Sequence, residues 1–189
     1  SIKAFQKAFT TYYPNNIYES NVCLIIKTFR PLNKNREWEN LKTLTEMDKR
    51  IIIIEEDMNH YELLKFYGCC DSLISLHRSE GFGRILAECL QLGLEVVTTD
   101  WGGNLDFCDE RFVHLVPHSM IKILPETYPN WPNQYWADPD ISVAALKLKA
   151  IAKGFKINDT KHSNKFSSKI CGKRLKLRVK EIVKDLSNK

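Results

Sequence analysis

The chain has 189 residues, of which 43% are hydrophobic and 27% are charged, and its formal net charge is +5. These values are those of an ordinary globular protein that is long enough to bury one core. No apolar run approaches the ~20 residues that are needed to cross a bilayer, so we do not expect an integral membrane protein.

Up to residue 116, short apolar runs alternate with helical patterns. A helical pattern opens the chain at residues 2–9, and others follow at 37–47, 59–67 and 83–92. The predicted strands, which are short and rich in β-branched residues, are 22–27, 51–55, 72–76, 96–99 and 113–116. Alternating strands and helices are typical of a doubly wound parallel sheet, so we predict one Rossmann-like α/β domain.

The pattern changes after the last predicted strand. Residues 117–139 are rich in proline and aromatic residues, and we expect a long irregular loop packed by its own rings. Asp138 is expected to cap the next helix, with Pro139 at its first position and Gly154 at its end. The apolar stripe expected on that helix consists of Val143, Leu146 and Ile151. A polar linker and a basic amphipathic helix at about 165–187 follow.

Six cysteines are present, and no two of them form a CxxC pair. Several lie in apolar stretches, where a thiol serves as a small hydrophobic group. We therefore interpret them as reduced thiols in the core, and reduced thiols favour a cytoplasmic protein.

The densest chemical signal is the segment Leu76-His-Arg-Ser-Glu-Gly-Phe-Gly-Arg-Ile-Leu-Ala-Glu88. It predicts a strand end, a glycine-bearing turn and a helix that carries a second glutamate. The first turn of a helix has unpaired amide donors and a partial positive charge, and Gly81 and Gly83 allow close approach of the backbone, so we predict a phosphate site here. From this position Glu88 can accept hydrogen bonds from ribose hydroxyls, and Glu80 can reach a sugar beyond the phosphates.

This segment resembles the glutamate, seven residues, glutamate motif of retaining glycosyltransferases with the GT-B fold. Ala87-Glu-Cys-Leu-Gln-Leu-Gly-Leu-Glu-Val-Val-Thr-Thr99 is similar to the helix, glycine and following strand of that family. Trp101-Gly-Gly-Asn-Leu-Asp106 is similar to its second glycine loop, and Tyr135-Trp-Ala-Asp-Pro-Asp140 before a helix also fits. The resemblance covers most of the chain and rests on several motifs in the same order.

The resemblance implies a role for each matching position. Glu80 would be the catalytic-site carboxylate that hydrogen-bonds hydroxyls of the donor sugar, and Glu88 would hold the ribose. Gly102 and Gly103 would form the floor beneath the sugar, and Lys27 at a strand end is a candidate phosphate cation. The backbone amides that would bind the distal phosphate are those of Phe82, Gly83, Arg84 and Ile85, and Gly81 completes the donor-binding turn.

The implied activity is transfer of a hexose from a nucleotide sugar, such as a UDP- or GDP-hexose, with retention of configuration. The acceptor would be a glycan or a lipid-linked acceptor, as in the synthesis of cell-surface polysaccharide or lipopolysaccharide. Attack on the face of the leaving nucleotide, with the phosphate helping to deprotonate the acceptor, needs no protein nucleophile. A non-catalytic nucleotide-sugar-binding module is the alternative.

The chain departs from the family in three respects. Leu94 and Glu95 stand where lysine and proline are usual, and the cationic phosphate clamp normally precedes the first strand, so Lys27 would be a substitute. GT-B enzymes place two Rossmann-like domains across a cleft, and this chain matches the second. The N-terminal, acceptor-binding domain would thus lie outside it, and we expect little or no transfer by the chain alone.

The same residues also have structural interpretations. Glu80 can cap the helix that follows it, and Glu88 can pair with Arg84 one turn earlier. His77 and Arg78 are interpreted as structural or solvent-facing residues, and the two glycines after Trp101 can form a simple turn. Two glutamates eight residues apart on a helix are separated by roughly 12 Å, which disfavours a glycosidase pair at ~5 to ~9.5 Å.

Asp138 and Asp140 resemble the metal-binding acid pair of the other glycosyltransferase fold. They stand at a helix start rather than at a strand end, however, where helix capping explains them better. We therefore predict neither a metal nor another cofactor.

Basic residues gather near the C-terminus, and a nucleic-acid site there is disfavoured because stacking aromatics and recognition motifs are missing nearby. A solvated helix face and contact with anionic lipid headgroups both stay open, and the second would place the protein peripherally at the inner face of the plasma membrane. The basic residues of this region are Lys161, Lys165, Lys169, Lys173, Arg174, Lys176, Arg178 and Lys180.

Overall fold

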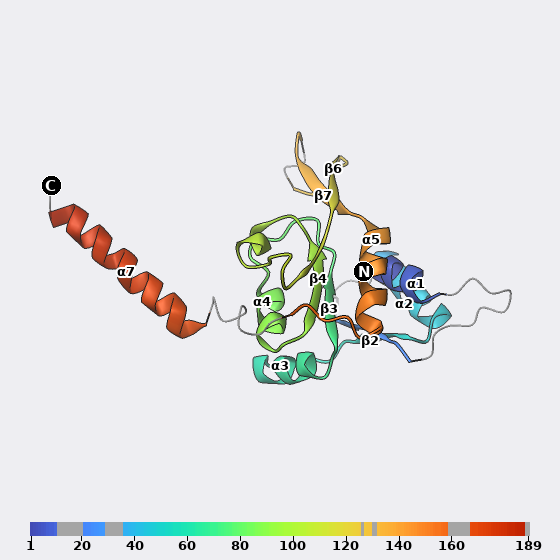
Figure 1. The fold of residues 1–189 in the computed structure, drawn as a ribbon. Helices are drawn as coiled ribbons and strands as arrows, with labels where there is room; N and C mark the ends of the chain where they lie inside the picture. Colours follow the sequence, from blue (N-terminus) through green and yellow to red (C-terminus); the bar gives the residue numbers. More distant parts are fainter. Residues whose placement is uncertain (11–20, 29–35, 126, 130–131, 159–166, 188–189) are drawn as a thin grey trace.

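The structure is a computed structural model that describes residues 1–10, 21–28, 36–125, 127–129, 132–158 and 167–187 (Figure 1). The helices are α1 (Ile2–Phe9), α2 (Arg36–Met47), α3 (His60–Gly68), α4 (Arg84–Gln91), α5 (Ile141–Ala152) and α7 (Ser168–Ser187), with a short 3-10 helix η1 (Gly103–Asp106). The strands are β1 (Leu24–Lys27), β2 (Ile51–Ile54), β3 (Ser72–Ser75), β4 (Glu95–Thr99), β5 (His114–Val116), β6 (His118–Lys122) and β7 (Tyr135–Pro139).

The five predicted strands are confirmed, each to within two residues, but in the described residues they pair as two parallel sheets rather than one. β1 pairs in parallel with β2, and β3, β4 and β5 pair in parallel in that order. The register sets Ile74 opposite Val97, and Thr99 opposite Val116, so the carboxyl ends of these strands lie along one edge. Ligands of doubly wound sheets bind at that edge, which is where the predicted glycine turns lie.

Helices cover both faces of the sheet, because neighbouring residues of a buried strand point in opposite directions. Val96 of β4 packs in one core cluster with α4, whereas Val97 packs in a second cluster with α1 and α5. Figure 1 shows this arrangement, with β3 and β4 between α4 on one side and α1 with α5 on the other. The three layers confirm the predicted α/β fold class.

Close packing of α1 against α5 depends on small residues. Ala4 and Ala8 of α1 and Ala144 and Ala145 of α5 are buried in the same core cluster, where their short side chains let the helices approach. The stripe predicted for α5 is therefore partly wrong, because Leu146 is 66% exposed and the alanines face the core. Hydrophobicity alone favoured Leu146, but the side of α5 that faces the core carries Ala144, Ala145 and Leu148.

The irregular loop predicted over 117–139 is wrong, because β6 and β7 form an antiparallel hairpin there. His118 pairs with Pro139, and Lys122 pairs with Tyr135. The hairpin projects from the carboxyl edge of the sheet (Figure 1). Proline has no amide donor, and the pairing uses it only at the end of β7, where no further ladder bond is required.

The predicted cap of α5 is also wrong. Asp138 lies within β7, and Asp140 is the N-cap, whose Oδ1 accepts the amides of Ser142 at 2.7 Å and Val143 at 3.1 Å. These two backbone hydrogen bonds, that from Val143 first, lower the pKa of Asp140. The helix ends at Ala152, and Gly154 follows with φ of +89°, as predicted for a glycine stop.

Asp140→Ala is expected to lower the melting temperature by about 2 to 4 °C, because the first turn of α5 loses its side-chain acceptor. Asp138→Ala is the matched control, since its carboxylate forms an exposed ion pair with Arg78, and such a pair contributes little. Thermal unfolding followed by circular dichroism measures both changes. An equal or larger shift for Asp138→Ala would contradict the assignment of the cap.

The cysteines and the C-terminal segment complete the comparison with the sequence. All six thiols are free, but only Cys89 and Cys108 are buried, and burial raises the pKa of each to about 12. Cys23, Cys69 and Cys171 are exposed, so the interpretation of every cysteine as a core thiol is wrong. The basic C-terminal helix is confirmed as α7, and Lys161 and Lys165 lie outside the described residues. Within the described ranges, no helix is both long and apolar enough to cross a membrane.

Candidate functional site

The turn that joins β3 to α4 is the centre of the candidate site. It runs from the end of β3 at Ser75 to Gly83, which is the N-cap of α4 and has φ of +85°. Glycine adopts this left-handed conformation without the strain that a side chain brings. The turn thereby directs the first amides of α4 toward the carboxyl edge of the sheet.

The carboxylate of Glu80 lies against the backbone of this turn. Its Oε1 accepts hydrogen bonds from the amides of Phe82 at 3.3 Å and Gly83 at 2.9 Å. This is the capping contact that the sequence allowed as an alternative, and it uses two of the four amides predicted for phosphate. A carboxylate has about four lone-pair positions on two oxygens, so Oε2 keeps acceptor capacity beyond these bonds.

The other two predicted amides, those of Arg84 and Ile85, belong to the first turn of α4. The first intrahelical bond runs from Ala87 to the carbonyl of Gly83, so the amides before Ala87 have no partner within the helix. They also lie at the positive end of the helix dipole. The structure therefore places amides without an intrahelical partner beside the Glu80 carboxylate.

Glu88 lies one turn further along α4, and its side chain is only 18% exposed. Its Oε1 lies 3.4 Å from Nε of Arg84 and 4.0 Å from Nδ1 of His60. The pair with Arg84 is the structural alternative that the sequence allowed. Tyr67 is a further neighbour, whose pKa is raised by burial first and then by the charge of Glu88.

The second glycine loop follows β4 and packs directly against the turn that holds Glu80. The amide of Gly103 donates to the Glu80 carbonyl oxygen at 2.9 Å. A Cβ at Gly103 would lie 1.8 Å from the carbonyl oxygen of Gly81, and a Cβ at Gly102 would lie 2.7 Å from that of Glu80. Only residues without a side chain allow this contact, so the two loops predicted from separate motifs form one surface.

His77 fixes the distance between these two loops. Its Nε2 lies 2.8 Å from the carbonyl oxygen of Trp101, and because a carbonyl only accepts, Nε2 carries the proton. The neutral tautomer then leaves Nδ1 to accept from the hydroxyls of Ser75 at 3.4 Å and Thr98 at 3.5 Å. In addition, Thr99 donates its hydroxyl hydrogen to the His77 carbonyl oxygen at 2.7 Å.

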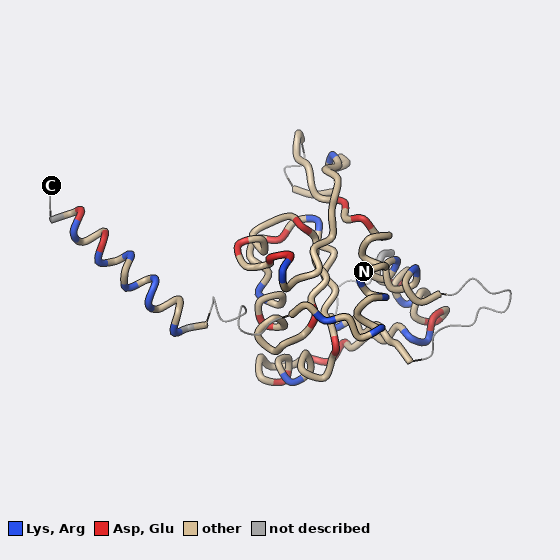
Figure 2. Tube along the Cα trace, viewed as in Figure 1, with Lys and Arg blue, Asp and Glu red and all other residues tan. Residues whose placement is uncertain are grey.

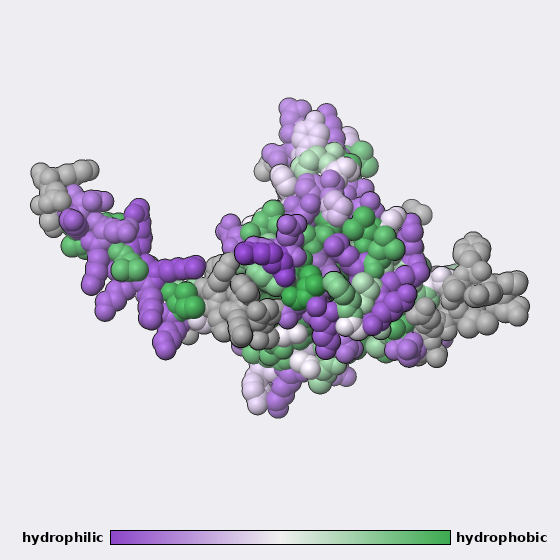
Figure 3. Space-filling view, in the orientation of Figure 1, coloured by the Kyte–Doolittle hydropathy of each residue, from purple (hydrophilic) through white to green (hydrophobic). Residues whose placement is uncertain are grey.

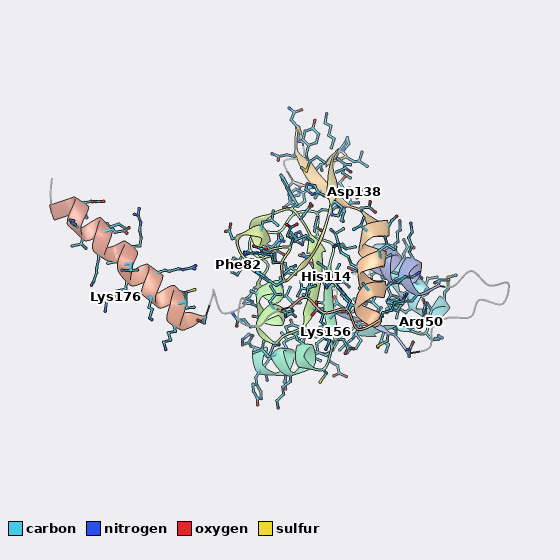
Figure 4. All side chains as sticks on the ribbon, viewed as in Figure 1. Arg50, Phe82, His114, Asp138, Lys156 and Lys176 are labelled. Carbon is cyan, nitrogen blue, oxygen red and sulfur yellow. The ribbon has the colours of Figure 1, made fainter. Side chains whose placement is uncertain are left out.

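Arg78 connects the first loop to the hairpin. Its guanidinium lies 3.2 Å from Oδ1 of Asp138 and 4.9 Å from the centre of the Trp136 ring. The Arg78 carbonyl also accepts the amide of Ala137 at 3.0 Å. Figure 4 shows Asp138 where the hairpin meets the body of the domain, and Phe82 at the opposite flank of the sheet edge.

The second loop is joined to the hairpin as well. His118 of β6 forms an ion-pair contact with Asp100, and its ring lies 5.2 Å from that of Trp101. Sequence reasoning missed Asp100, His118 and Trp136, because the pairing of the hairpin brings them to the site edge from distant positions. The Trp101-Gly-Gly sequence and the Tyr135-Trp-Ala-Asp-Pro-Asp140 motif were the signals near them.

Lys27, the predicted phosphate cation, lies at the carboxyl end of β1, which pairs with β2 rather than with β3–β5. Its ammonium group donates to the carbonyl oxygen of Thr28 at 2.9 Å. A small cavity of about 160 Å³ lies at the amino edge of the sheet, between Phe9 and Lys153, and shares no residue with the candidate site. In the part of the chain that the structure describes, no group of three or more His, Cys, Asp or Glu residues could hold a metal ion.

The arrangement has a definite chemical character. The helix start offers amide donors for an anion, and the carboxylates of Glu80 and Glu88 offer acceptors for hydroxyl groups on either side of it. The glycines of the loop after β4 contribute only backbone atoms to this surface. A ligand that combines a phosphate with two hydroxyl-bearing rings would match these groups.

Comparison with known proteins shows the fold. No protein-family model matches the chain, and a search of curated proteins gave no match. The sucrose-phosphate synthase of Thermosynechococcus elongatus is similar in structure, with a TM-score of 0.57 and 15% sequence identity over 87% of this chain and 38% of that chain. The chain has the Rossmann-like α/β fold of such GT-B glycosyltransferases and spans less than half the length of this neighbour.

Two weaker likenesses were found among solved structures. The GtfA/B complex matches 88% of this chain and 30% of its own, with a TM-score of 0.49 and 18% identity. Anabaena HepE in complex with UDP-glucose matches 83% of this chain and 42% of its own, with a TM-score of 0.46 and 15% identity. Likeness at these identities concerns the fold, and the chemistry of the site has to be argued from the residues of this chain.

Proposed function

We propose that this chain is the donor-binding domain of a retaining GT-B glycosyltransferase that transfers a hexose from a nucleotide sugar. The observation that carries the proposal is the junction of β3 with α4, where amide donors and the Glu80 carboxylate meet the second glycine loop. This juxtaposition occurs at the carboxyl edge of a parallel sheet, where such folds bind nucleotides.

Each part of the donor has a place in the proposed complex. The distal phosphate binds the amides of Arg84 and Ile85, because the Oε1 atom of Glu80 already occupies those of Phe82 and Gly83. The donor sugar lies over Gly102 and Gly103 and meets Oε2 of Glu80, while Lys27 approaches the phosphates from β1. No metal is needed in this scheme, since helix dipole and cations supply the positive charge.

Glu88 holds the ribose in the proposed complex. A ribose offers two neighbouring hydroxyl donors, and a carboxylate with two oxygens accepts both. In the structure Glu88 pairs with Arg84 and His60. These contacts orient the Glu88 side chain for the ribose.

The proposed transfer retains configuration, with the acceptor attacking the face from which the nucleotide leaves. The leaving phosphate accepts the acceptor's proton, so that no side chain has to act as a nucleophile. The acceptor, a glycan or a lipid-linked sugar of a cell-surface polysaccharide pathway, binds a second Rossmann-like domain outside these residues. The complete enzyme would work in the cytoplasm, where nucleotide sugars are made.

Calorimetric titration with UDP, GDP and their hexose conjugates tests donor binding. We expect one nucleotide family to bind, and Glu88→Gln to weaken it about tenfold, which corresponds to ~1.4 kcal/mol of lost ribose hydrogen bonding. Glu110→Gln, at an exposed acid away from the site, is the matched control and should bind as the unchanged chain does. Unchanged affinity of Glu88→Gln would contradict the ribose role, and failure of all nucleotides to bind would contradict the donor site.

A further inference from the structure

Helix α7 stands apart from the α/β body (Figure 1), and its residues 171–186 are exposed throughout. It is 20 residues long, about 30 Å at the usual rise of a helix. Apart from its helical backbone bonds, its contacts include a local ion pair, Arg178 with Glu181 at 3.1 Å. An isolated helix of this length is marginal in water, and packing of an amphipathic face against something else is what normally stabilises it.

The charge of the chain is concentrated on this helix. Residues 168–187 contain seven Lys or Arg and two acids, which leaves +5, the formal charge of the whole chain. The other residues carry 21 basic and 21 acidic side chains and are balanced. Figure 2 shows the basic positions along α7 against the mixed charges of the body. A partner for α7 should therefore be strongly anionic.

Five lysines form a row along one side of α7. They recur at helical spacing of four, three, four and four residues, so their side chains share one face. The two acids of the helix, Glu181 and Asp185, lie on the opposite flank, so the row is uninterrupted by negative charge. The residues of this lysine row are Lys169, Lys173, Lys176, Lys180 and Lys184.

An apolar row runs along a different side of α7, roughly 130° around the helix from the lysine row at about 100° per residue. Its members follow one another at steps of four, three and four residues, and their exposed fractions run from 43% for Ile182 to 67% for Leu186. Figure 3 shows apolar patches between polar ones on the visible side of α7. The residues of this apolar row are Leu175, Val179, Ile182 and Leu186.

We propose that α7 lies flat on the surface of an anionic phospholipid bilayer, with the apolar row inserted between headgroups and the flanking basic side chains reaching the phosphates. Basic side chains beside exposed aliphatic ones are the pattern of helices that bind at this interface. This attachment is independent of donor binding at the sheet edge, and it would bring the domain within reach of lipid-linked substrates.

Self-association through the apolar row fits the charges less well. The spacing of Leu175, Val179, Ile182 and Leu186 is compatible with a two-stranded coiled coil. Two copies of α7 would, however, bring +5 beside +5, and each helix has only Glu181 and Asp185 to offset it. An anionic lipid surface would attract this positive charge instead of repelling it. Lipid is therefore the better partner.

Cosedimentation of the full chain with lipid vesicles tests the proposal. We expect binding to vesicles of phosphatidylcholine with phosphatidylglycerol and little binding to phosphatidylcholine alone. Lys176→Glu with Lys180→Glu should weaken binding at least about tenfold, because both charges of the row are reversed. Leu175→Ser with Ile182→Ser should bind at low salt but largely dissociate at physiological salt, because half of the apolar row is lost and the remaining attraction is mainly electrostatic and screened by salt.

Lys122→Glu with Lys153→Glu is the matched control, since it changes the net charge equally at exposed positions of the body. It should bind like the unchanged chain, and circular dichroism should show the same helix content in all variants. Three outcomes would each overturn the proposal. The first is an equal loss of binding in the control pair, and the second is no binding to phosphatidylglycerol vesicles. The third is a dimer in sedimentation velocity that dissociates in Leu175→Ser with Ile182→Ser. Nucleotide titration of the same variants keeps this outcome separate from that of the donor site.

Discussion

Glu95→Ala is expected to lower the free energy of unfolding by about 3 kcal/mol or more, because it leaves several buried donors unpaired. Glu95 and His114 are each 4% exposed, and Oε2 of Glu95 accepts from Nε2 of His114 at 2.9 Å. The same carboxylate accepts the amides of Ile157 at 3.2 Å and Asn158 at 3.1 Å. The substitution thus removes the anchor of the chain segment that follows α5.

Urea unfolding at neutral pH measures this loss. Glu95→Gln keeps the shape but replaces one acceptor oxygen with a donor group, and we expect an intermediate loss. Glu110→Ala removes an exposed acid and is the matched control, with an expected change within about 0.5 kcal/mol. A loss below about 1 kcal/mol for Glu95→Ala would contradict the buried network.

The same network predicts how stability depends on pH. Burial lowers the pKa of His114 below its ordinary value, although the hydrogen bond to Glu95 opposes the shift. The unfolded chain takes up a proton on this residue as pH falls through about 6.5, whereas the folded chain resists it, so stability decreases from pH 7 toward pH 5. His114→Gln should reduce this slope, and a slope equal to that of the unchanged chain would contradict the role of His114.

Local patterns were enough to predict the sheet, because buried parallel strands are continuous apolar runs. Residues 51–54 are four isoleucines in succession, and 96–97 are two valines between polar residues. Such runs stay apolar whichever face each residue points to, so the prediction does not depend on register. The first and last residues of a strand are predicted less accurately than its presence: β1 begins at Leu24 rather than at residue 22.

The hairpin could not be predicted from local patterns. β6 and β7 lack a clean alternation of apolar and polar residues, and twelve residues separate Lys122 from Tyr135, so no tight-turn signature marks the connection. Asp138-Pro139 looks like a helix start, yet pairing of Pro139 with His118 places it in a strand. Tertiary pairing therefore moved the cap two residues along, to Asp140.

The candidate site shows the same division between local and distant information. The glycine turn before α4 is encoded within eight residues, so the turn itself was predicted from the sequence, whereas the contact of Glu80 with the amides of Phe82 and Gly83 had been only the alternative interpretation. The contacts of Arg78 with Asp138 and of Asp100 with His118 join residues 60 and 18 positions apart. No rule of residue spacing predicts such pairs, so the contacts of the hairpin with the site were not predicted.

Gly103→Ala is expected to destabilise the chain by about 1 to 3 kcal/mol, because the new methyl group has no space between two stretches of backbone. It would lie 1.8 Å from the carbonyl oxygen and 2.7 Å from the carbonyl carbon of Gly81. Backbone atoms cannot rotate away as a side chain can, so the loop after β4 must move and lose the bond from the Gly103 amide to Glu80. A fall in melting temperature of about 2 to 12 °C corresponds to this loss.

Gly81→Ala is the matched control for this substitution, since it lies in the opposing loop and a Cβ there meets nothing within 4 Å. Its stability should change by less than about 0.5 kcal/mol in thermal and urea unfolding. Because Gly103→Ala separates the Glu80 turn from the glycine floor, it should also weaken nucleotide-sugar binding beyond what its stability loss explains at temperatures where it is still folded. If Gly103→Ala were as stable as Gly81→Ala, the two loops could not be in backbone contact, and the surface on which the donor site is built would have to be arranged differently.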